Sequence, residues 1–343
     1  MPRIMFVTNS LSGGGAERAI NLVVNEMIAR NVEVSLVPIN AGQEDWVKPT
    51  CPVFQVQRTW KSGLIETAFS WIRFNSIIII WKPDILVLNC DIPELFGLFS
   101  FSRAKIIVVE HANPAWSTRP TFGKIIRNLL RLRKPKWVAV SEHLKIWPWN
   151  EIPDRILENS IVFNDDVKNK KSVVDQDSQV TRLLYVGRLA SAQKRPQIVI
   201  EVAASTGLPV LFIGDGEMRV SLEEMARNCG VSAEFAGSKI NPWDNFQCGD
   251  LLIVPSAWEG DGLVVVEALQ NNIPLLLSDI RDFKRFNLPA FTYCKGAEDY
   301  VNKIKNSEST REFVIPATVS SAVLKTRSIS VVGDNWIDFL KNP

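Results

Sequence analysis

The strongest constraint on the fold of this chain is an alternation of short apolar runs with segments of helical periodicity. In the first half the apolar runs are IMFVT, VEVSLVPI, DILVLN, KIIVVEH and WVAVS. Between the first two, residues 16–30 repeat apolar side chains at spacings of three and four, which predicts a helix. Short β-rich runs that alternate with helices indicate a parallel sheet covered on both faces. We therefore predict an α/β, doubly wound fold.

The alternation occurs a second time after a polar interruption. Residues 164–182 are charged and poor in large apolar side chains, as is typical of a linker. Beyond them the runs RLLYVG, PVLFIGDG, LLIVPS and IPLLLS again alternate with helical segments. The 343 residues fit two Rossmann-like domains, at 1–168 and 169–325, with a cleft at the carboxyl ends of the strands. Residues 326–343 predict a terminal helix that could pack back on the first domain.

Composition excludes several classes of protein. A net charge of +2 argues against a nucleic-acid binder held by global charge. Five cysteines are scattered singly and only two histidines are present, so we expect a reducing compartment and no bound metal. The first residues lack a signal-peptide pattern, so we expect a cytoplasmic protein. The most apolar segment, 69–83, is interrupted by Arg73 and Asn75; it cannot span a membrane but could touch a membrane surface.

The run SGGGAER lies between the first predicted strand and the first predicted helix. The backbone amides of Gly13, Gly14 and Gly15 could therefore approach a phosphate or a sugar beside the start of the helix. The run matches neither the dinucleotide-binding pattern nor the Walker loop. A flexible turn is the alternative interpretation.

A cation-rich loop opens the second domain. In YVGRLASAQKRPQ a strand ends at Gly187 and is followed by Arg188, Lys194 and Arg195. A guanidinium fork and an ammonium group at the mouth of a sheet can hold a diphosphate. The alternative is a solvated loop. This alternative is less favoured because the cations directly follow the first strand of the domain.

The stretch WEGDGLVVVEAL carries two glutamates, Glu259 in a loop and Glu267 inside a helix that begins near Gly262. A glycosidase needs two carboxyl groups that project toward one bond, and a loop and a helix do not easily provide this. Carboxylates also accept paired hydrogen bonds from vicinal hydroxyl groups. The pair therefore indicates two ends of a cradle for an elongated ligand, with the start of the helix facing its phosphates.

Together these stretches resemble the retaining GT-B glycosyltransferases of family GT4, of the bacterial surface-polysaccharide type, over nearly the whole chain. The stretches that carry the resemblance, in the order of that family, are SGGGAERA, KPDILVLN, IIVVEH, VAVSEHL, YVGRLASAQKRP, FIGDGEMR, GDLLIVPSAWEGDGLVVVEAL and PLLLSD. The element from Glu259 to Glu267 is the E-x7-E signature. The resemblance implies two facing Rossmann-like domains and transfer of a hexose or N-acetylhexosamine from a nucleotide sugar, most often a UDP-sugar.

The resemblance also implies roles for individual residues. Arg188 and Lys194 would stabilise the departing diphosphate, Glu259 would bind the transferred sugar, and Glu267 would bind the ribose. The remaining implied contacts to the donor come from Gly14, Gly15, His111, Gly187, Gly262 and Leu263, with His111 beside the sugar. The resemblance also implies that transfer needs neither a metal nor another cofactor. It implies front-face transfer, in which the departing phosphate oxygen takes the proton of the acceptor, so the two carboxylates need not both be catalytic.

The chain departs from the family pattern at two places. Asp261 stands where the family often has an aromatic residue, and DIRDFKRF follows PLLLSD where the family has a glycine-rich segment with an acid. Both departures concern the donor sugar and the rim of the site rather than the reaction class. We expect a wall of the base site in residues 235–241.

A basic segment in the first domain suggests the acceptor side. Residues 119–136 carry seven basic and no acidic side chains, interleaved with apolar ones. Such a helix suits anionic lipid headgroups, and the candidate contacts are Lys124, Arg127, Arg131 and Arg133. We expect a glycan acceptor linked to a lipid, as in O-antigen, lipopolysaccharide or capsule synthesis, on the inner face of the cytoplasmic membrane. The alternative is a solvated helix that packs its apolar face on the sheet.

Other functions remain open on the sequence alone. An NAD-dependent dehydrogenase would need the glycine fingerprint that this chain lacks. A non-catalytic glycan-binding partner subunit is disfavoured because the charged residues of the site are all present. Another GT-B activity, such as nucleotide-sugar epimerisation or sugar-phosphate synthesis, is the nearer alternative.

Overall fold

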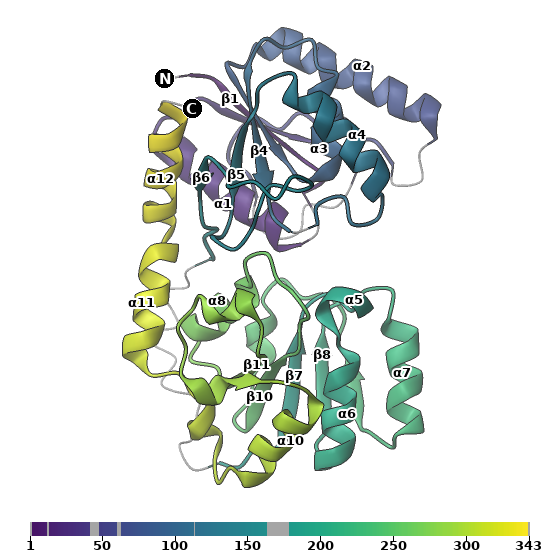
Figure 1. Ribbon diagram of the computed structural model, residues 1–343, viewed down its shortest axis with the longest axis vertical. Helices are drawn as coiled ribbons and strands as arrows, with labels where there is room; N and C mark the ends of the chain where they lie inside the picture. Colours follow the sequence, from purple (N-terminus) through teal and green to yellow (C-terminus); the bar gives the residue numbers. More distant parts are fainter. Residues whose placement is uncertain are drawn as a thin grey trace. The chain divides into compact units, whose positions relative to one another are not determined.

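The computed structural model describes residues 2–11, 14–41, 48–59, 63–112, 114–162 and 178–341. These residues form two compact units (Figure 1). Unit 1 contains the chain up to residue 162 together with residues from 326 onward, and unit 2 contains the described residues 178–325. The alternating pattern of the sequence is the physical origin of both units, because each apolar run becomes a buried strand of a parallel sheet.

Unit 1 is built on a parallel sheet of six strands in the order β2-β1-β3-β4-β5-β6. The strands are β1 (Ile4–Thr8), β2 (Val34–Pro38), β3 (Ile85–Asn89), β4 (Lys105–Glu110), β5 (Lys136–Ala139) and β6 (Arg155–Ile156). Its helices are α1 (Gly15–Ala29), α2 (Leu64–Trp81), α3 (Asp91–Leu98), α4 (Pro120–Arg131) and α12 (Ile329–Lys341).

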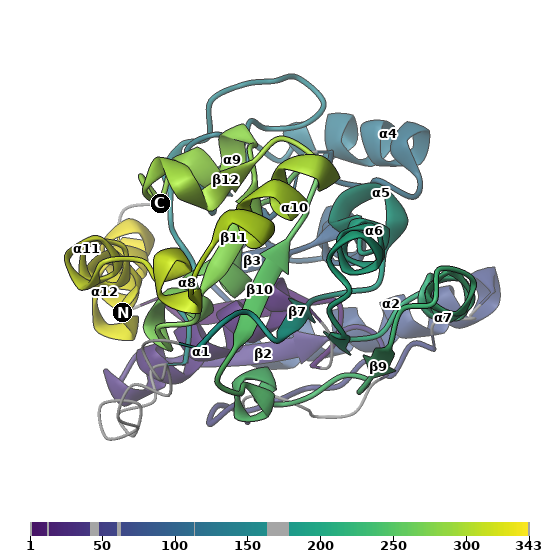
Figure 2. The same ribbon diagram turned by 90° about the horizontal axis from the view of Figure 1, so that it is seen from below.

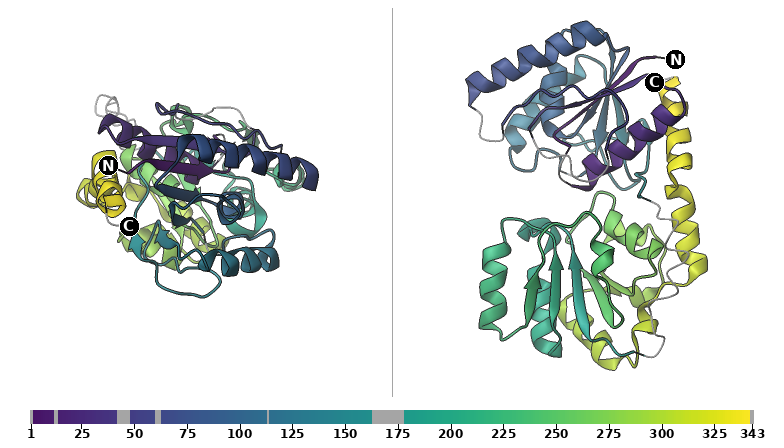
Figure 3. Two further views of the ribbon diagram at one scale, coloured as in Figure 1. Left: turned by 90° about the horizontal axis from the view of Figure 1, so that it is seen from above. Right: turned by 180° about the vertical axis from the view of Figure 1, so that it is seen from behind.

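Side chains of alternate residues divide the core of unit 1 between the two faces of its sheet. Ile4 and Phe6 of β1 pack with α1 and α12, while Met5 and Val7 pack with α2, α3 and α4. Figure 3 shows the pairing of α1 with α12, and Trp336 of α12 packs against the ring of Phe6. The last helix of the chain thus completes the core of the first unit.

Unit 2 repeats the plan with a parallel sheet in the order β12-β11-β10-β7-β8-β9. Its strands are β7 (Arg182–Val186), β8 (Val210–Ile213), β9 (Ala233–Phe235), β10 (Asp250–Val254), β11 (Leu275–Ser278) and β12 (Tyr293–Cys294). Its helices are α5 (Ser191–Lys194), α6 (Gln197–Thr206), α7 (Arg219–Asn228), α8 (Leu263–Gln270), α9 (Arg281–Lys284) and α10 (Ala297–Asn306), with a 3-10 turn η2 at Pro242–Asn245. Another helix, α11 (Ala317–Arg327), precedes α12.

One face of the unit 2 sheet is covered by α6, α7 and α10, whose buried side chains pack on β7, β8 and β10. Figure 2 shows α6 and α10 beside these strands. The prediction of two doubly wound α/β domains is therefore confirmed. Among the described residues, no helix has the length and apolar character needed to cross a membrane.

Candidate active site

The loop after β7 is shaped by close packing against the loop after β8. A Cβ atom on Gly214 would lie 1.9 Å from the carbonyl oxygen of Gly187, so only glycine allows this approach. The hydroxyl of Tyr185 donates to the carbonyl of Arg188 at 2.7 Å. Burial raises the pKa of Tyr185, and the charge of Glu259 adds to the effect, so the phenol remains protonated as a donor. The Arg188 side chain that follows is exposed.

Lys194 and Glu259 form an ion pair. The Lys194 Nζ lies 2.6 Å from Glu259 Oε1, although the two residues stand 65 positions apart in the sequence. Glu259 is only 6% exposed and also accepts a hydrogen bond from Ser256 Oγ at 2.6 Å. Lys194 ends the single turn α5 after β7, and Glu259 follows β10, the strand that pairs with β7. Strand pairing therefore brings a cation and a carboxylate to one edge of the sheet.

The second glutamate of the signature has a different neighbour. Glu267 lies in α8, is 8% exposed and accepts a hydrogen bond at Oε2 from the indole nitrogen of Trp243, at 3.2 Å. Gly262 precedes the first residue of this helix, Leu263, with a φ of 69°, a left-handed conformation that favours glycine. The backbone amides at the start of α8 therefore lie in sequence between the two carboxylates, as the spacing predicts.

The two departures from the family pattern contact this same loop. Arg285 donates to both the carbonyl and the carboxylate of Asp261, and Asp282 accepts the backbone N–H of Glu259 at 2.7 Å. The ring of Phe283 lies next to Gly262, within 3.2 Å of where a Cβ atom on that residue would be. The segment after β11 thus braces the loop after β10, because these two strands are neighbours in the sheet.

Several of these contacts were not predicted from the sequence. Ser256, Asp282 and Arg285 were not among the predicted site residues. Trp243 lies outside residues 235–241, where a wall of the base site was expected. A usable signal was present in the order of elements: Ser256 follows β10, Asp282 and Arg285 lie in and after α9, the helix that follows β11, and Trp243 lies in the turn before β10. Arg195, considered as a diphosphate ligand, instead donates to the carbonyls of Pro255 and Ser256, so its guanidinium holds the loop after β10.

The candidates in unit 1 lie at the carboxyl edge of its own sheet. Helix α1 begins at Gly15, and Gly14 precedes it without a side-chain cap for the helix amides; Gly13 is outside the described residues. His111 follows β4, and its Nε2 contacts Asn89 Oδ1 at the end of β3. The amide of Asn89 in turn donates to Thr8 Oγ1 at 3.3 Å, at the end of β1. A polar chain therefore crosses the ends of three adjacent strands.

The prediction that Arg127 contacts a membrane is wrong, because this residue is only 1% exposed. Its guanidinium makes a fork with Glu94 at 2.5 and 2.9 Å and a third bond to Glu110 at 2.7 Å. Burial raises the pKa of Glu110 to about 8. The single positive charge of Arg127 balances only one of the two buried carboxylates, so the other carboxyl group keeps its proton. Glu110 is the protonated one, because it has one bond to Arg127 where Glu94 has two. At Arg127 the structure therefore agrees with the alternative interpretation, in which the helix packs on the sheet.

Arg133 also departs from its predicted role, whereas Lys124 and Arg131 lie at the surface. Arg133 Nη1 donates to the carbonyls of Gly97 and Ser100 at 2.9 and 3.1 Å, so it ties the end of α4 to the loop after α3. Arg131 pairs with Glu151 at 2.8 Å. Lys124 is exposed on the outer side of α4.

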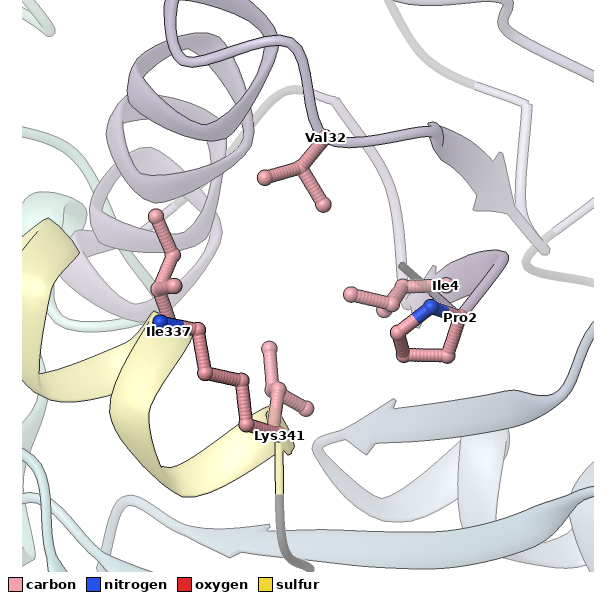
Figure 4. A pocket seen from close by; sticks show the side chains of 6 residues that line it. Pro2, Ile4, Val32, Ile337 and Lys341 are labelled. Atoms are coloured by element: carbon pink, nitrogen blue, oxygen red, sulfur yellow. The ribbon is translucent and has the colours of Figure 1, made fainter.

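A small apolar pocket lies elsewhere in unit 1 (Figure 4). It lies between α12 and the amino ends of β1 and β2, and its lining residues are Pro2, Ile4, Val32, Ile337, Leu340 and Lys341. This is the edge of the sheet opposite to Gly14 and His111, so the pocket contains none of the candidate residues.

The two Rossmann-like domains, each with a parallel six-stranded sheet, have the architecture of the GT-B fold. Residues 166–312 match the family model described as Glycosyl transferases group 1. A Campylobacter jejuni relative, named GalNAc-alpha-(1->4)-GalNAc-alpha-(1->3)-diNAcBac-PP-undecaprenol alpha-1,4-N-acetyl-D-galactosaminyltransferase, is 25% identical over 287 residues, which cover 78% of this chain and 77% of the relative. The chain is therefore an enzyme of the hexosyltransferase class.

Solved structures agree on the fold. Anabaena HepE, crystallised with UDP and glucose, is 15% identical with a TM-score of 0.79, and the match covers 100% of both chains. The lipopolysaccharide outer core galactosyltransferase WaaB is 18% identical with a TM-score of 0.66, over 98% of this chain and 99% of that one. At such identities the likeness concerns the fold alone.

Proposed function

We propose that the enzyme transfers a hexose or an N-acetylhexosamine from a UDP-sugar to a lipid-linked glycan, with retention of anomeric configuration and without a metal. The observation that carries the proposal is the pairing of Lys194 with the buried Glu259 beside the start of α8. A cation and a buried carboxylate are paired there, the backbone amides that begin α8 follow three residues after Glu259, and groups of these kinds can bind a sugar diphosphate.

Each group has a task in the reaction. Arg188 and Lys194 stabilise the charge that develops on the departing diphosphate, while the amides at Gly262 and Leu263 bind its oxygens. Glu267 accepts hydrogen bonds from the ribose and Glu259 from the transferred sugar. The acceptor oxygen bonds to the anomeric carbon on the face that the phosphate oxygen leaves, and that phosphate oxygen takes the hydroxyl proton. For Gly14, Gly15 and His111 of unit 1, contact with the donor stays a prediction.

The nature of the acceptor is supported by the relatives. The name of the Campylobacter jejuni relative contains a glycan on diphospho-undecaprenol, and that of WaaB contains lipopolysaccharide. With such an acceptor, we propose that the enzyme works at the inner face of the cytoplasmic membrane, as a peripheral protein of surface-polysaccharide synthesis.

The proposal is tested with purified full-length protein and a panel of UDP-, GDP- and ADP-sugars, with undecaprenyl-diphosphate oligosaccharides as acceptors. We expect UDP release that depends on acceptor, persists in EDTA and yields a product with the anomeric configuration of the donor, read by proton NMR. Preference for a GDP- or ADP-sugar, or an inverted product, would overturn the corresponding part. Interconversion of the nucleotide sugar without transfer would indicate an epimerase instead.

A further inference from the structure

The helical layer formed by α2, the loop after α3 and α4 concentrates exposed apolar side chains. Of the 16 large apolar side chains exposed in the described residues, 11 lie in this layer, each 41% to 79% exposed. They are Ile65, Phe69, Ile72, Ile79, Ile80, Phe99, Phe101, Phe122, Ile125, Leu129 and Leu132. Soluble proteins expose apolar side chains singly, so this concentration indicates a contact surface.

The exposed apolar side chains of α2 form a stripe along the helix that is interrupted at the exposed Ser76. Ile65, Phe69, Ile72 and then Ile79 recur at helical spacing on the side away from the sheet, while Phe74 and Ile78 fill the core beneath. The 18 residues of α2 extend over about 27 Å at 1.5 Å per residue. Figure 3 shows α2, in blue, on the outer side of unit 1. Because the other side of α2 is buried on the sheet, its exposed apolar side chains can meet a membrane only along the surface of unit 1.

The loop after α3 joins the α2 stripe to the end of α4. From α2, the Trp71 indole donates to the carbonyl of Phe99 at 2.8 Å and its ring packs edge-on against Phe101, with centroids 5.1 Å apart. From α4, Arg133 binds the carbonyls of Gly97 and Ser100. Two anchored sides therefore hold Phe99 and Phe101 outward next to the stripe, and Leu132 lies beside Arg133.

The charges of this layer select the kind of partner. Seven cations are exposed in and beside this layer, namely Arg73, Lys82, Arg103, Lys105, Lys124, Arg131 and Lys134, against one exposed acid, Asp84, which follows α2. Glu66, the sole acid in residues 64–82, 99–105 and 120–134, is turned to Thr59 at 3.0 Å. Glu151 offsets only Arg131. Apolar side chains ringed by cations complement a bilayer that contains anionic lipid.

We propose that the face formed by the α2 stripe, Phe99, Phe101 and Leu132 inserts into the interfacial region of an anionic bilayer. The inference deepens the proposed function, because it rests on a lipid-linked acceptor and moves the main membrane contact from the basic helix to α2. The exposed cations hold the headgroups, and the aliphatic and aromatic side chains enter the acyl boundary. The first unit is thus held flat against the membrane.

Sedimentation with vesicles tests the face. Full-length protein is mixed with phosphatidylcholine vesicles, with or without phosphatidylglycerol, at low salt and at high salt. We expect binding to the anionic vesicles, a fraction of which survives high salt because apolar insertion is not screened. The variant F69S/I72S/F101S should bind at least about tenfold more weakly, since each loses buried apolar area. The matched control I152S/V220S removes two side chains as exposed, at 77% and 67%, and should bind like the wild type.

Two further readouts keep the outcomes separate. UDP affinity and hydrolysis of the UDP-sugar in solution should be equal in F69S/I72S/F101S and wild type, which also reports correct folding; if neither protein binds UDP, the proposed function fails while the membrane result stands. Equal vesicle binding by F69S/I72S/F101S and wild type overturns the inference. So does a wild-type dimer in light scattering that becomes monomeric in the variant, because the face would then bind a second copy of this chain.

Discussion

The ammonium nitrogen of Lys194 lies 2.6 Å from a carboxylate oxygen of Glu259. The residue predicted to bind the diphosphate and the residue predicted to bind the sugar are therefore in direct contact. The pair is held from both sides, because Ser256 binds the same carboxylate oxygen and Asp282 binds the Glu259 backbone. The cation is thereby fixed in position beside the carboxylate before any charge develops on a leaving group. This pre-positioning is what electrostatic stabilisation of a departing diphosphate requires.

Removal of the cation should therefore act on turnover. We expect Lys194→Ala to lower kcat by about 10²- to 10³-fold, the usual effect of losing one group that stabilises developing charge. Steady-state assays of UDP release would measure this. Lys305→Ala, an exposed lysine on α10, is the control and should leave kcat unchanged. An unaltered kcat in Lys194→Ala would remove Lys194 from the site.

The two glutamates should separate in binding measurements. Glu267→Gln should weaken the affinity for free UDP by about tenfold or more, since a hydrogen bond to a charged group contributes about 1.5–3 kcal/mol. Glu259→Gln should leave the affinity for UDP nearly unchanged and lower turnover of the UDP-sugar. Isothermal titration calorimetry with UDP compares them directly. Equal losses of UDP affinity would contradict the division of roles.

Trp243 should affect the same measurement through Glu267. Trp243→Phe keeps an aromatic ring but removes the indole N–H that binds Glu267 Oε2 at 3.2 Å. We expect UDP to bind about three- to tenfold more weakly, the effect of losing one ordinary hydrogen bond that orients the carboxylate. In the Glu267→Gln background the substitution should add little further loss. Additive losses would mean that Trp243 contacts the nucleotide independently of Glu267.

The sequence was sufficient for the fold because strands and helices leave a local pattern. Buried runs such as IMFVT and LLIVPS became β1 and β10, and the predicted start of a helix near Gly262 is the start of α8. The partners of charged side chains leave no such pattern. Arg127 stands in a run of basic residues, yet Glu94 and Glu110 reach it from α3 and β4, because the order of strands brings those elements together. Charge patterns along one helix therefore overestimated the solvated face of α4.

The brace between Asp261 and Arg285 should control the geometry of the Glu259 loop. Their side chains are 5% and 15% exposed, so Arg285→Met leaves a poorly solvated carboxylate and should cost about 3 kcal/mol of unfolding free energy. The double variant D261N/R285M should cost less than the sum of the single variants, because neither charge is then left alone. Urea denaturation measures the stabilities, and KM for the UDP-sugar should rise in Arg285→Met with UDP affinity retained. Additive stabilities would mean that the two side chains act independently.

The buried Glu110 should make stability depend on pH. Its pKa is raised to about 8 by burial, so its contribution is fully present below its unfolded pKa of about 4.3 and is lost as the pH rises through the folded value. The free energy of unfolding should fall by up to about 1.4 kcal/mol per pH unit in this window. Glu110→Gln should flatten that slope, and the residual slope should reflect Asp91, whose pKa burial raises to about 6. Denaturation at several pH values tests this, with the exposed Glu151→Gln as a control that should keep the wild-type slope.

Arg127 and Lys124 provide the sharpest contrast on α4. They are three residues apart in one basic helix, but Arg127 binds Glu94 and Glu110 within the core and Lys124 is exposed. Arg127→Met should lower the free energy of unfolding by about 3–5 kcal/mol, because two buried carboxyl groups lose their cation. Lys124→Ala should change it by less than about 0.5 kcal/mol and weaken only the binding of anionic vesicles. If Arg127→Met were as stable as the wild type but bound vesicles poorly, Arg127 would be a membrane contact after all, and the core network would not be its role.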